Sequence, residues 1–322
     1  MKIKRIAVLK IVISLAIITL LLTRINLIQA WNQLQNLSLP FIVFALLYYA
    51  GCQWLSCWRW QLVIRATGYS IPMSTLLSSY FIGMFVNIFL PGSIGGDVYR
   101  VYRVAQKIQD SEAALASVFL ERFTGLASLS MIALLALPAA FRLVGRWDII
   151  ILLITCIVTL MGGTLLIANS KLLAWAEPWL IKFHLGSFAV RFAKIQIFLH
   201  KFTQNRRALV LSMVLSLLLQ LAIVYYFYIV ANQLKIPISS LELLVFIPII
   251  TVVTILPISL GGLGLREGLW VYLFTRVDLN AEQAILLSLT TTLLNWFVSF
   301  SGAIILGLDA AGIEVIKKSR VD

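Results

Sequence analysis

The sequence predicts an all-α, polytopic membrane protein with about six full spans and two broken, re-entrant helical hairpins in an inverted repeat. Three observations lead to this prediction. The 322 residues are 61% hydrophobic and 12% charged, and the mean hydropathy of +0.98 excludes a soluble globular domain. The apolar residues form runs long enough to cross a bilayer. One short motif occurs twice, once in each half of the chain.

The repeated motif begins with Leu-Pro and ends with Arg. Its copies are Leu90-Pro-Gly-Ser-Ile-Gly-Gly-Asp-Val-Tyr-Arg100 and Leu256-Pro-Ile-Ser-Leu-Gly-Gly-Leu-Gly-Leu-Arg266. Without a gap, both read L-P-x-S-I/L-G-G-x-x-x-R. The match indicates an internal duplication within one transmembrane domain that covers residues 1–322. Its predicted halves are about 1–168 and 208–322, and a basic amphipathic segment at 169–207 joins them.

Each motif follows an apolar run directly, at 76–90 and at 241–256. Proline lacks an N–H donor and clashes with the preceding helical turn, and glycine permits backbone shapes that other residues avoid. Each motif should therefore end one helix and begin another at membrane depth, where irregular backbone is tolerated only beside protein or a water-filled cavity. Broken helices at matching places in two halves are typical of transporter binding sites.

The remaining apolar runs are predicted to span the bilayer completely. The basic stretch 1–10 precedes the first run, as in a signal peptide. No convincing cleavage site with small residues precedes Trp31, so we expect an uncleaved first span. Trp54, Trp58 and Trp60 beside Arg59 are predicted to form an aromatic belt at the membrane interface. The predicted spans are 11–22, 39–58, 113–141, 149–168, 208–230 and 281–308.

The distribution of the 26 Lys and Arg residues predicts the orientation. If each broken segment enters and leaves the membrane on one side, most of these residues fall in the cytoplasm together with both termini. If the broken segments crossed completely, the basic segment 169–207 would lie outside, against the positive-inside rule. The hairpin arrangement inserts the first motif from the cytoplasm and the second from outside, as an inverted repeat requires.

The net charge of +13 has two interpretations. Basic residues alternate with aromatic residues in segment 169–207, and such a pattern can bind single-stranded nucleic acid by stacking. In a polytopic protein the pattern is more typical of an amphipathic helix on anionic lipid, so we expect no nucleic-acid partner. His184 and His200 have no third ligand nearby, and the three cysteines lack metal-ligand spacing. We expect no metal and no cofactor.

The motifs predict an anion-binding site. A helix that begins inside the membrane presents unpaired N–H groups and a partial positive charge, which suit phosphate or carboxylate. Arg100 and Arg266, one turn further along, would add guanidinium contacts to an anionic headgroup. The alternative is a pair of simple helix breaks, each with an arginine that reaches the interface. The candidate substrate-binding residues at the motifs are Asn87, Ser93, Gly95, Gly96, Asp97, Arg100, Ser259, Gly261, Gly262, Gly264, Arg266 and Glu267.

Glu121 and Arg122 complete the candidate site, because charge within a membrane span is costly and usually functional. Adjacent residues on a helix point about 100° apart, so each of the two needs a partner elsewhere. Asp97 or Glu267 would neutralise Arg122. Arg100 or Arg266 would neutralise Glu121. A structural ion-pair network and a direct substrate role both fit this pattern.

These residues carry a family resemblance. The pattern N-x-x-L-P-G-S-x-G-G-D-x-x-R at Asn87–Arg100, then Glu121-Arg122, then L-P-x-S-x-G-G-x-G-x-R-E at Leu256–Glu267, resembles the transmembrane region of lysylphosphatidylglycerol synthase/flippase and related flippase-like proteins. The resemblance covers essentially the whole chain. It implies a bacterial cytoplasmic (inner) membrane protein that moves, or helps to move, an anionic lipid or a polyprenyl-phosphate-linked sugar between leaflets.

The synthase carries a soluble aminoacyl-transferase domain after this region, and we expect that domain to be absent here, because the chain ends shortly after its last predicted span. Two other functions are consistent with the residues. An integral membrane transferase would use Glu121 as a general base and the arginines as a phosphate clamp. No His, Cys or Ser with base-like neighbours supports it, so a transporter is favoured over an enzyme. The second alternative is a non-transporting partner of a membrane glycosyltransferase. The resemblance implies it, because relatives occur beside or fused to glycosyltransferases that handle polyprenyl-phosphate sugars.

The predicted orientation is tested by labelling single cysteines in intact cells with a membrane-impermeant thiol reagent. Labels at Gln35 and Asn232 should react from outside, and labels at Gln196 and Ser319 should be shielded. Reaction at Gln196 would contradict the hairpin arrangement and the inverted repeat with it.

Overall fold

The computed structural model describes residues 37–89, 94–143, 197–255, 262 and 264–318, with isolated positions between 147 and 162. All regular structure in these ranges is α-helical, which confirms the predicted fold class. The predicted span at 11–22 lies outside the described residues. So do most of the span at 149–168 and most of the basic segment.

Within the described ranges, four helices are long and apolar enough to cross a bilayer, and they correspond to four of the predicted full spans. The chain is therefore a multi-pass membrane protein. Asn205 begins the third of these helices, because its side chain accepts a hydrogen bond from the Ala208 N–H at 3.1 Å. The four helices are α3 (Leu39–Ala66), α6 (Ser111–Leu143), α10 (Arg206–Gln233) and α13 (Ala281–Lys318).

Two pairs of shorter helices flank the motifs, so the helices end and begin where the repeated sequence predicts. In the first pair the ring of Tyr80 lies over the Arg100 guanidinium, 4.5 Å from its carbon. In the second pair the rings of Phe246 and Phe274 are 6.3 Å apart. Each pair therefore folds back on itself as a helical hairpin. The pairs are α4 (Met73–Phe89) with α5 (Ile94–Ile108), and α11 (Ser240–Ile255) with α12 (Leu265–Phe274).

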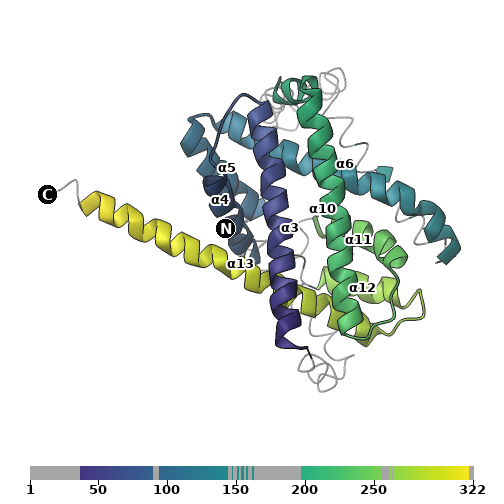
Figure 1. Cartoon of the computed structure of the whole chain (residues 1–322). Helices are drawn as coiled ribbons and strands as arrows, with labels where there is room; N and C mark the ends of the chain where they lie inside the picture. Colours follow the sequence, from purple (N-terminus) through teal and green to yellow (C-terminus); the bar gives the residue numbers. More distant parts are fainter. Residues whose placement is uncertain are drawn as a thin grey trace, which may run out of the picture.

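The long helices α3 and α10 run antiparallel, side by side (Figure 1). The rings of Tyr48 and Tyr225 are tilted against each other with centroids 5.9 Å apart, while Arg59 donates to Ser216 at 2.8 Å. Residue numbers therefore increase along α3 in the direction in which they decrease along α10, so the two helices are antiparallel. Because α4 follows α3 and α11 follows α10 after short connections, the two hairpins start from opposite ends of this helix pair. An inverted repeat requires this arrangement.

The helix contacts follow a two-fold pattern across the described part of the chain. Exchanging α3 with α10, α4 with α11, α5 with α12 and α6 with α13 converts every extensive helix–helix contact into another contact that is present. In particular, α6 packs against the hairpin helix α11, and α13 packs against the hairpin helix α4. Each half therefore covers the hairpin of the other half. The exact boundaries of the repeat halves stay predictions.

The contact between α13 and the first hairpin is close. A Cβ atom placed on Gly302 of α13 would overlap the backbone carbonyl of Phe81 in α4. Further along α13, Asp309 accepts a hydrogen bond from Arg103 of α5 at 2.6 Å, within an ion pair. Small residues allow such close helix approach in membranes, where packing replaces the hydrophobic effect. Gly302 thus sets how closely α13 approaches the hairpin.

Replacing Gly302 by alanine should destabilise the protein by about 1 to 3 kcal/mol, because the added methyl group must push α13 away from α4. The measurement is thermal unfolding in detergent. Gly307→Ala is the matched control on the same helix, since a Cβ there meets nothing within 4 Å; it should leave the melting temperature unchanged or raise it slightly. Equal melting temperatures for the two variants would show that α13 does not pack against α4 as described.

Candidate functional site

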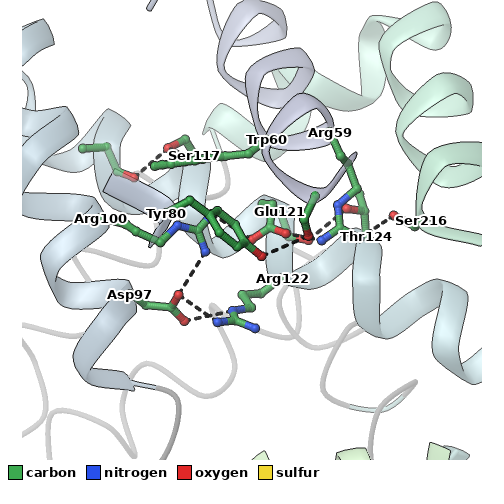
Figure 2. Close-up of polar contacts among 12 residues, drawn as sticks. Arg59, Trp60, Tyr80, Asp97, Arg100, Ser117, Glu121, Arg122, Thr124 and Ser216 are labelled. Atoms are coloured by element: carbon green, nitrogen blue, oxygen red, sulfur yellow. Dashed lines mark hydrogen bonds and ion pairs between the residues drawn. The ribbon is translucent and has the colours of Figure 1, made fainter. Parts of the chain in front are cut away.

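A buried carboxylate, that of Glu121 in α6, lies at the centre of an ion-pair network (Figure 2). Glu121 is 1% exposed, and both of its carboxylate oxygens accept from guanidinium groups. Arg59 of α3 donates through Nη2 to Oε1, and Arg100 of α5 donates through Nη2 to Oε2 at 3.0 Å. Arg59 also donates through Nη1 to Ser216 of α10 at 2.8 Å. One carboxylate thereby connects four helices.

Arg100 is held between aromatic rings. Its guanidinium carbon lies 4.1 Å from the Trp60 ring centroid and 4.5 Å from that of Tyr80. Its Nη1 donates to Asp97 at 3.1 Å, and the residue is only 3% exposed. Both terminal nitrogens of Arg100 are thus engaged within the protein. A ligand that took over either of these two contacts would have to displace a carboxylate.

The two aromatic side chains are fixed in turn by hydroxyl groups. The Trp60 indole N–H donates to Ser117 at 3.2 Å, and the Tyr80 hydroxyl donates to Ser56 at 2.9 Å. Aromatic faces attract a guanidinium group, and the attraction is stronger where water is excluded. The position of Arg100 is therefore set by packing and by charge together.

Arg122 forms the open end of the network. Its Nε and Nη2 donate to the two oxygens of Asp97, both at 2.9 Å, in a bidentate ion pair. The Arg122 side chain is 44% exposed, whereas the adjacent Glu121 is buried. Successive side chains on a helix point about 100° apart, so Glu121 points to Arg59 and Arg100 while Arg122 points to Asp97 and the hollows beside it.

Three hollows meet at the Asp97–Arg122 pair, because both residues line all three. The first, about 340 Å³, extends past Arg59 and Glu121 to Gln220 of α10 and Thr251 of α11. The second, about 210 Å³, lies by the first hairpin and includes Asn87 and Gly96 in its lining. The third, about 280 Å³, is an apolar groove along α5 and α6.

The charges of the network do not cancel. Among the described residues, Arg59, Arg100 and Arg122 face only Asp97 and Glu121 in these ion pairs, which leaves one positive charge in excess. The Nε atoms of Arg59 and Arg100 are buried and make no hydrogen bond in the described structure. Unneutralised charge at membrane depth is costly. The network therefore favours an anion beside it.

The same contacts bear on acid–base chemistry. Since both oxygens of Glu121 are occupied by guanidinium groups, the carboxylate is not placed to take a proton from a substrate. The described residues also contain no group of three or more His, Cys, Asp or Glu side chains suited to hold a metal ion. The site as described is a network of arginines and carboxylates in which the cations outnumber the anions.

The other predicted residues of the first motif lie close to the network. Asn87 accepts a hydrogen bond from the Gly96 N–H at 2.6 Å, so this backbone donor at the start of α5 already has a partner. A Cβ on Gly96 would overlap the Gly83 carbonyl, which explains why only glycine fits. Gly95 lies in the first turn of α5, and Ser93 lies outside the described residues.

The second motif forms its own cluster. Glu267 is 3% exposed and accepts hydrogen bonds from the Gly264 N–H at 2.6 Å and from Ser288 at 3.1 Å. Arg266 donates to the same carboxylate through Nε at 3.0 Å and Nη2 at 2.9 Å. Gly262 and Gly264 each have a φ of +81°, a conformation that favours glycine. Ser259 and Gly261 lie outside the described residues.

The structure thus selects between the predicted partners. Arg122 pairs with Asp97, and Glu121 pairs with Arg100, both from the first motif. Within the described ranges, no hydrogen bond or ion pair joins Arg266 or Glu267 to either residue. The two motifs therefore form two polar clusters rather than one.

The predicted aromatic belt on α3 is wrong in part. Trp54 and Trp58 are exposed, but Trp60 and Arg59 are buried in the network. The sequence held a signal for this burial, because polar residues recur every three positions at Gln53, Ser56 and Arg59 on an otherwise apolar helix. All three are buried. Residues three or four apart lie on the same face of a helix. The three polar residues therefore form one inward-facing stripe, and the two exposed tryptophans, four apart, lie together on another face.

Comparison with known proteins finds similarity to membrane proteins along nearly the whole chain. A family model described as "Lysylphosphatidylglycerol synthase TM region" matches residues 7–302. A UPF0104 membrane protein from Methanothermobacter thermautotrophicus is 23% identical over 276 residues, which cover 79% of this chain and 77% of that protein. Another, from Pyrococcus horikoshii, is 23% identical over 332 residues and 97% of each chain. Both relatives are archaeal, so a bacterial inner-membrane location stays a prediction.

Glu121→Gln should lower the free energy of unfolding by about 3 to 5 kcal/mol, because it leaves Arg59 and Arg100 buried without their shared carboxylate. Thermal or denaturant unfolding in detergent measures the loss. Glu242→Gln, at the exposed start of α11, is the matched control and should cost no more than about 1 kcal/mol. Equal stability of the two variants would contradict the network.

Proposed function

The chain belongs to the lysylphosphatidylglycerol synthase transmembrane-region family, and from this premise we propose that it translocates, or assists the translocation of, an anionic lipid or polyprenyl-phosphate-linked sugar between leaflets. The observation that carries the proposal is the position of Arg122. It is the exposed cation of a network with excess positive charge, and it lies within a helix long enough to span the membrane. Such a group suits a phosphate that must enter the bilayer.

In the proposed reaction cycle, Asp97 occupies the guanidinium fork of Arg122 while no lipid is bound. A headgroup phosphate offers the same two acceptor oxygens and takes the place of the carboxylate. Asp97 keeps its contact with Arg100 at 3.1 Å, so it is not left without a cation. Exchanging one anion for another keeps the charge near Arg122 balanced, and this lowers the free-energy cost of bringing the headgroup to membrane depth.

The hollows around the pair give the headgroup room. The first hollow, about 340 Å³, reaches from Asp97 and Arg122 to residues of both halves, with Gln220, Thr251 and Thr254 in its lining. Side-chain amide and hydroxyl groups would bind glycerol or sugar hydroxyls beside the phosphate. A transferase reaction is disfavoured by comparison, because the two oxygens of Glu121 are already engaged.

The proposal is tested with purified protein in liposomes that contain fluorescent phosphatidylglycerol. The protein should accelerate movement of the label between leaflets without changing the lipid chemically. Arg122→Gln should slow this movement by roughly ten- to a hundredfold, the loss expected for a charge-assisted hydrogen-bonded contact of about 1.5 to 3 kcal/mol.

The control for net charge is Arg65→Gln, which removes an exposed arginine from the last turn of α3. It should transport like the parent protein. Melting temperatures of both variants should be measured alongside transport. Parent-like transport by a folded Arg122→Gln variant would refute the role of Arg122, and chemical conversion of the lipid would favour a transferase.

A further inference from the structure

The apolar groove between α5 and α6 is not needed for binding a headgroup. Asp97 and Arg122 lie at one end of it, where α5 begins and α6 has passed its third turn. Val98, which is 61% exposed, opens the groove to the surrounding lipid. The other lining side chains are apolar: Val101, Leu115, Val118 and Phe119.

We propose that this groove holds a hydrocarbon chain of the lipid whose phosphate binds Arg122. The inference rests on the proposed function and adds a second part to the binding site. The substrate class is then an anionic amphiphile in which the phosphate lies close to the hydrocarbon, rather than a soluble phosphate compound. The groove and the 340 Å³ hollow share Asp97 and Arg122 as a common wall, so one molecule of this kind occupies both.

Charge complementarity identifies this occupant. Apolar protein surface gains little from contact with lipid chains in particular, since lipid tails are as apolar as leucine. Any lipid chain would therefore fill the groove without preference if its lining were only apolar. The guanidinium of Arg122 at its inner end changes this, because it binds an anionic headgroup and thereby selects the chain attached to it.

The chain offers a matched comparison. A separate hollow of about 160 Å³, away from the Asp97–Arg122 pair, has only apolar lining residues, contributed by α6, α10 and α11. Leu135 lines it and is 71% exposed. This hollow should accept lipid chains without regard to headgroup charge, since no ionised side chain lines it.

The experiment measures which lipid lies in each hollow. A fluorescent thiol label is placed at Val98→Cys or at Leu135→Cys, after replacement of the three native cysteines. Each protein is placed in phosphatidylcholine nanodiscs with a small fraction of lipid brominated on its chains, either phosphatidylglycerol or phosphatidylcholine. With the label at Val98→Cys, brominated phosphatidylglycerol should quench the fluorescence at a mole fraction about tenfold lower than brominated phosphatidylcholine needs. At Leu135 the two lipids should quench alike.

Two substitutions connect this preference to the ion pair. Arg122→Gln should abolish the preference at Val98. Asp97→Asn should strengthen it, because the substitution removes the internal carboxylate that competes for Arg122. A gain of preference cannot arise from misfolding, so the second variant keeps the test decisive if the first is unstable.

Several outcomes would overturn the proposal: equal quenching by both lipids at Val98, the same preference at Leu135, or a preference that survives Arg122→Gln. Displacement of the quenching lipid by millimolar glycerol phosphate would mean that the phosphate alone is recognised. Transport is measured separately. Transport without a preference at Val98 refutes the groove alone, whereas a preference without transport refutes only the proposed function.

Discussion

The buried carboxylate of Glu121 is the constraint on which the described structure depends. Two guanidinium groups, from Arg59 and Arg100, are stable in the bundle because this side chain lies between them. A buried ion pair adds little net stability over an apolar core of equal volume, but the loss of one partner is severe. The network therefore acts mainly by specifying one arrangement, in which α3, α5, α6 and α10 meet at a single point.

The duplicated scaffold carries different chemistry in its two halves. In the first half, Arg100 binds a carboxylate 21 positions later, on α6. In the second half, the hydrogen bond that connects the same two elements runs from Ser288 to Glu267, again 21 positions apart, and Arg266 is neutralised by its neighbour. The helix contacts are thus repeated, whereas, of the two motif clusters in the described structure, the first alone has more cations than anions in its ion pairs. Among the described residues, this asymmetry places the proposed anion site in the first half alone.

Much of this architecture could be predicted from the sequence, since proline and paired glycines determine where helices break and apolar runs determine the spans. The pairs Asp97–Arg122 and Arg100–Glu121 were among the predicted partners, because charge inside a membrane needs compensation. The burial of Arg59 was missed. Its partner lies 62 positions away on another helix, and hydropathy near the end of a span does not tell an inward-facing arginine from an interfacial one.

The pairing of Arg266 with Glu267 was missed for a different reason. Neighbours on a helix normally face different directions, but Glu267 folds back to accept the Gly264 N–H at the start of α12, and this brings its carboxylate within reach of Arg266. Such a contact depends on the backbone of the turn before the helix. There Gly264 has a φ of +81°, which side-chain spacing along a sequence does not reveal.

In the proposed cycle, the Asp97–Arg122 pair also connects ligand binding to helix movement. Asp97 belongs to the first hairpin and Arg122 to α6, so an anion that takes the place of Asp97 removes one attachment between these elements. The hairpin then keeps its attachments to α13, at Gly302 and through Arg103 and Asp309. A ligand shifts a conformational equilibrium only through a difference in affinity between the two states. In the proposed cycle, competition between carboxylate and phosphate for one guanidinium would supply that difference, while the Arg100–Glu121 ion pair still joins α5 to α6.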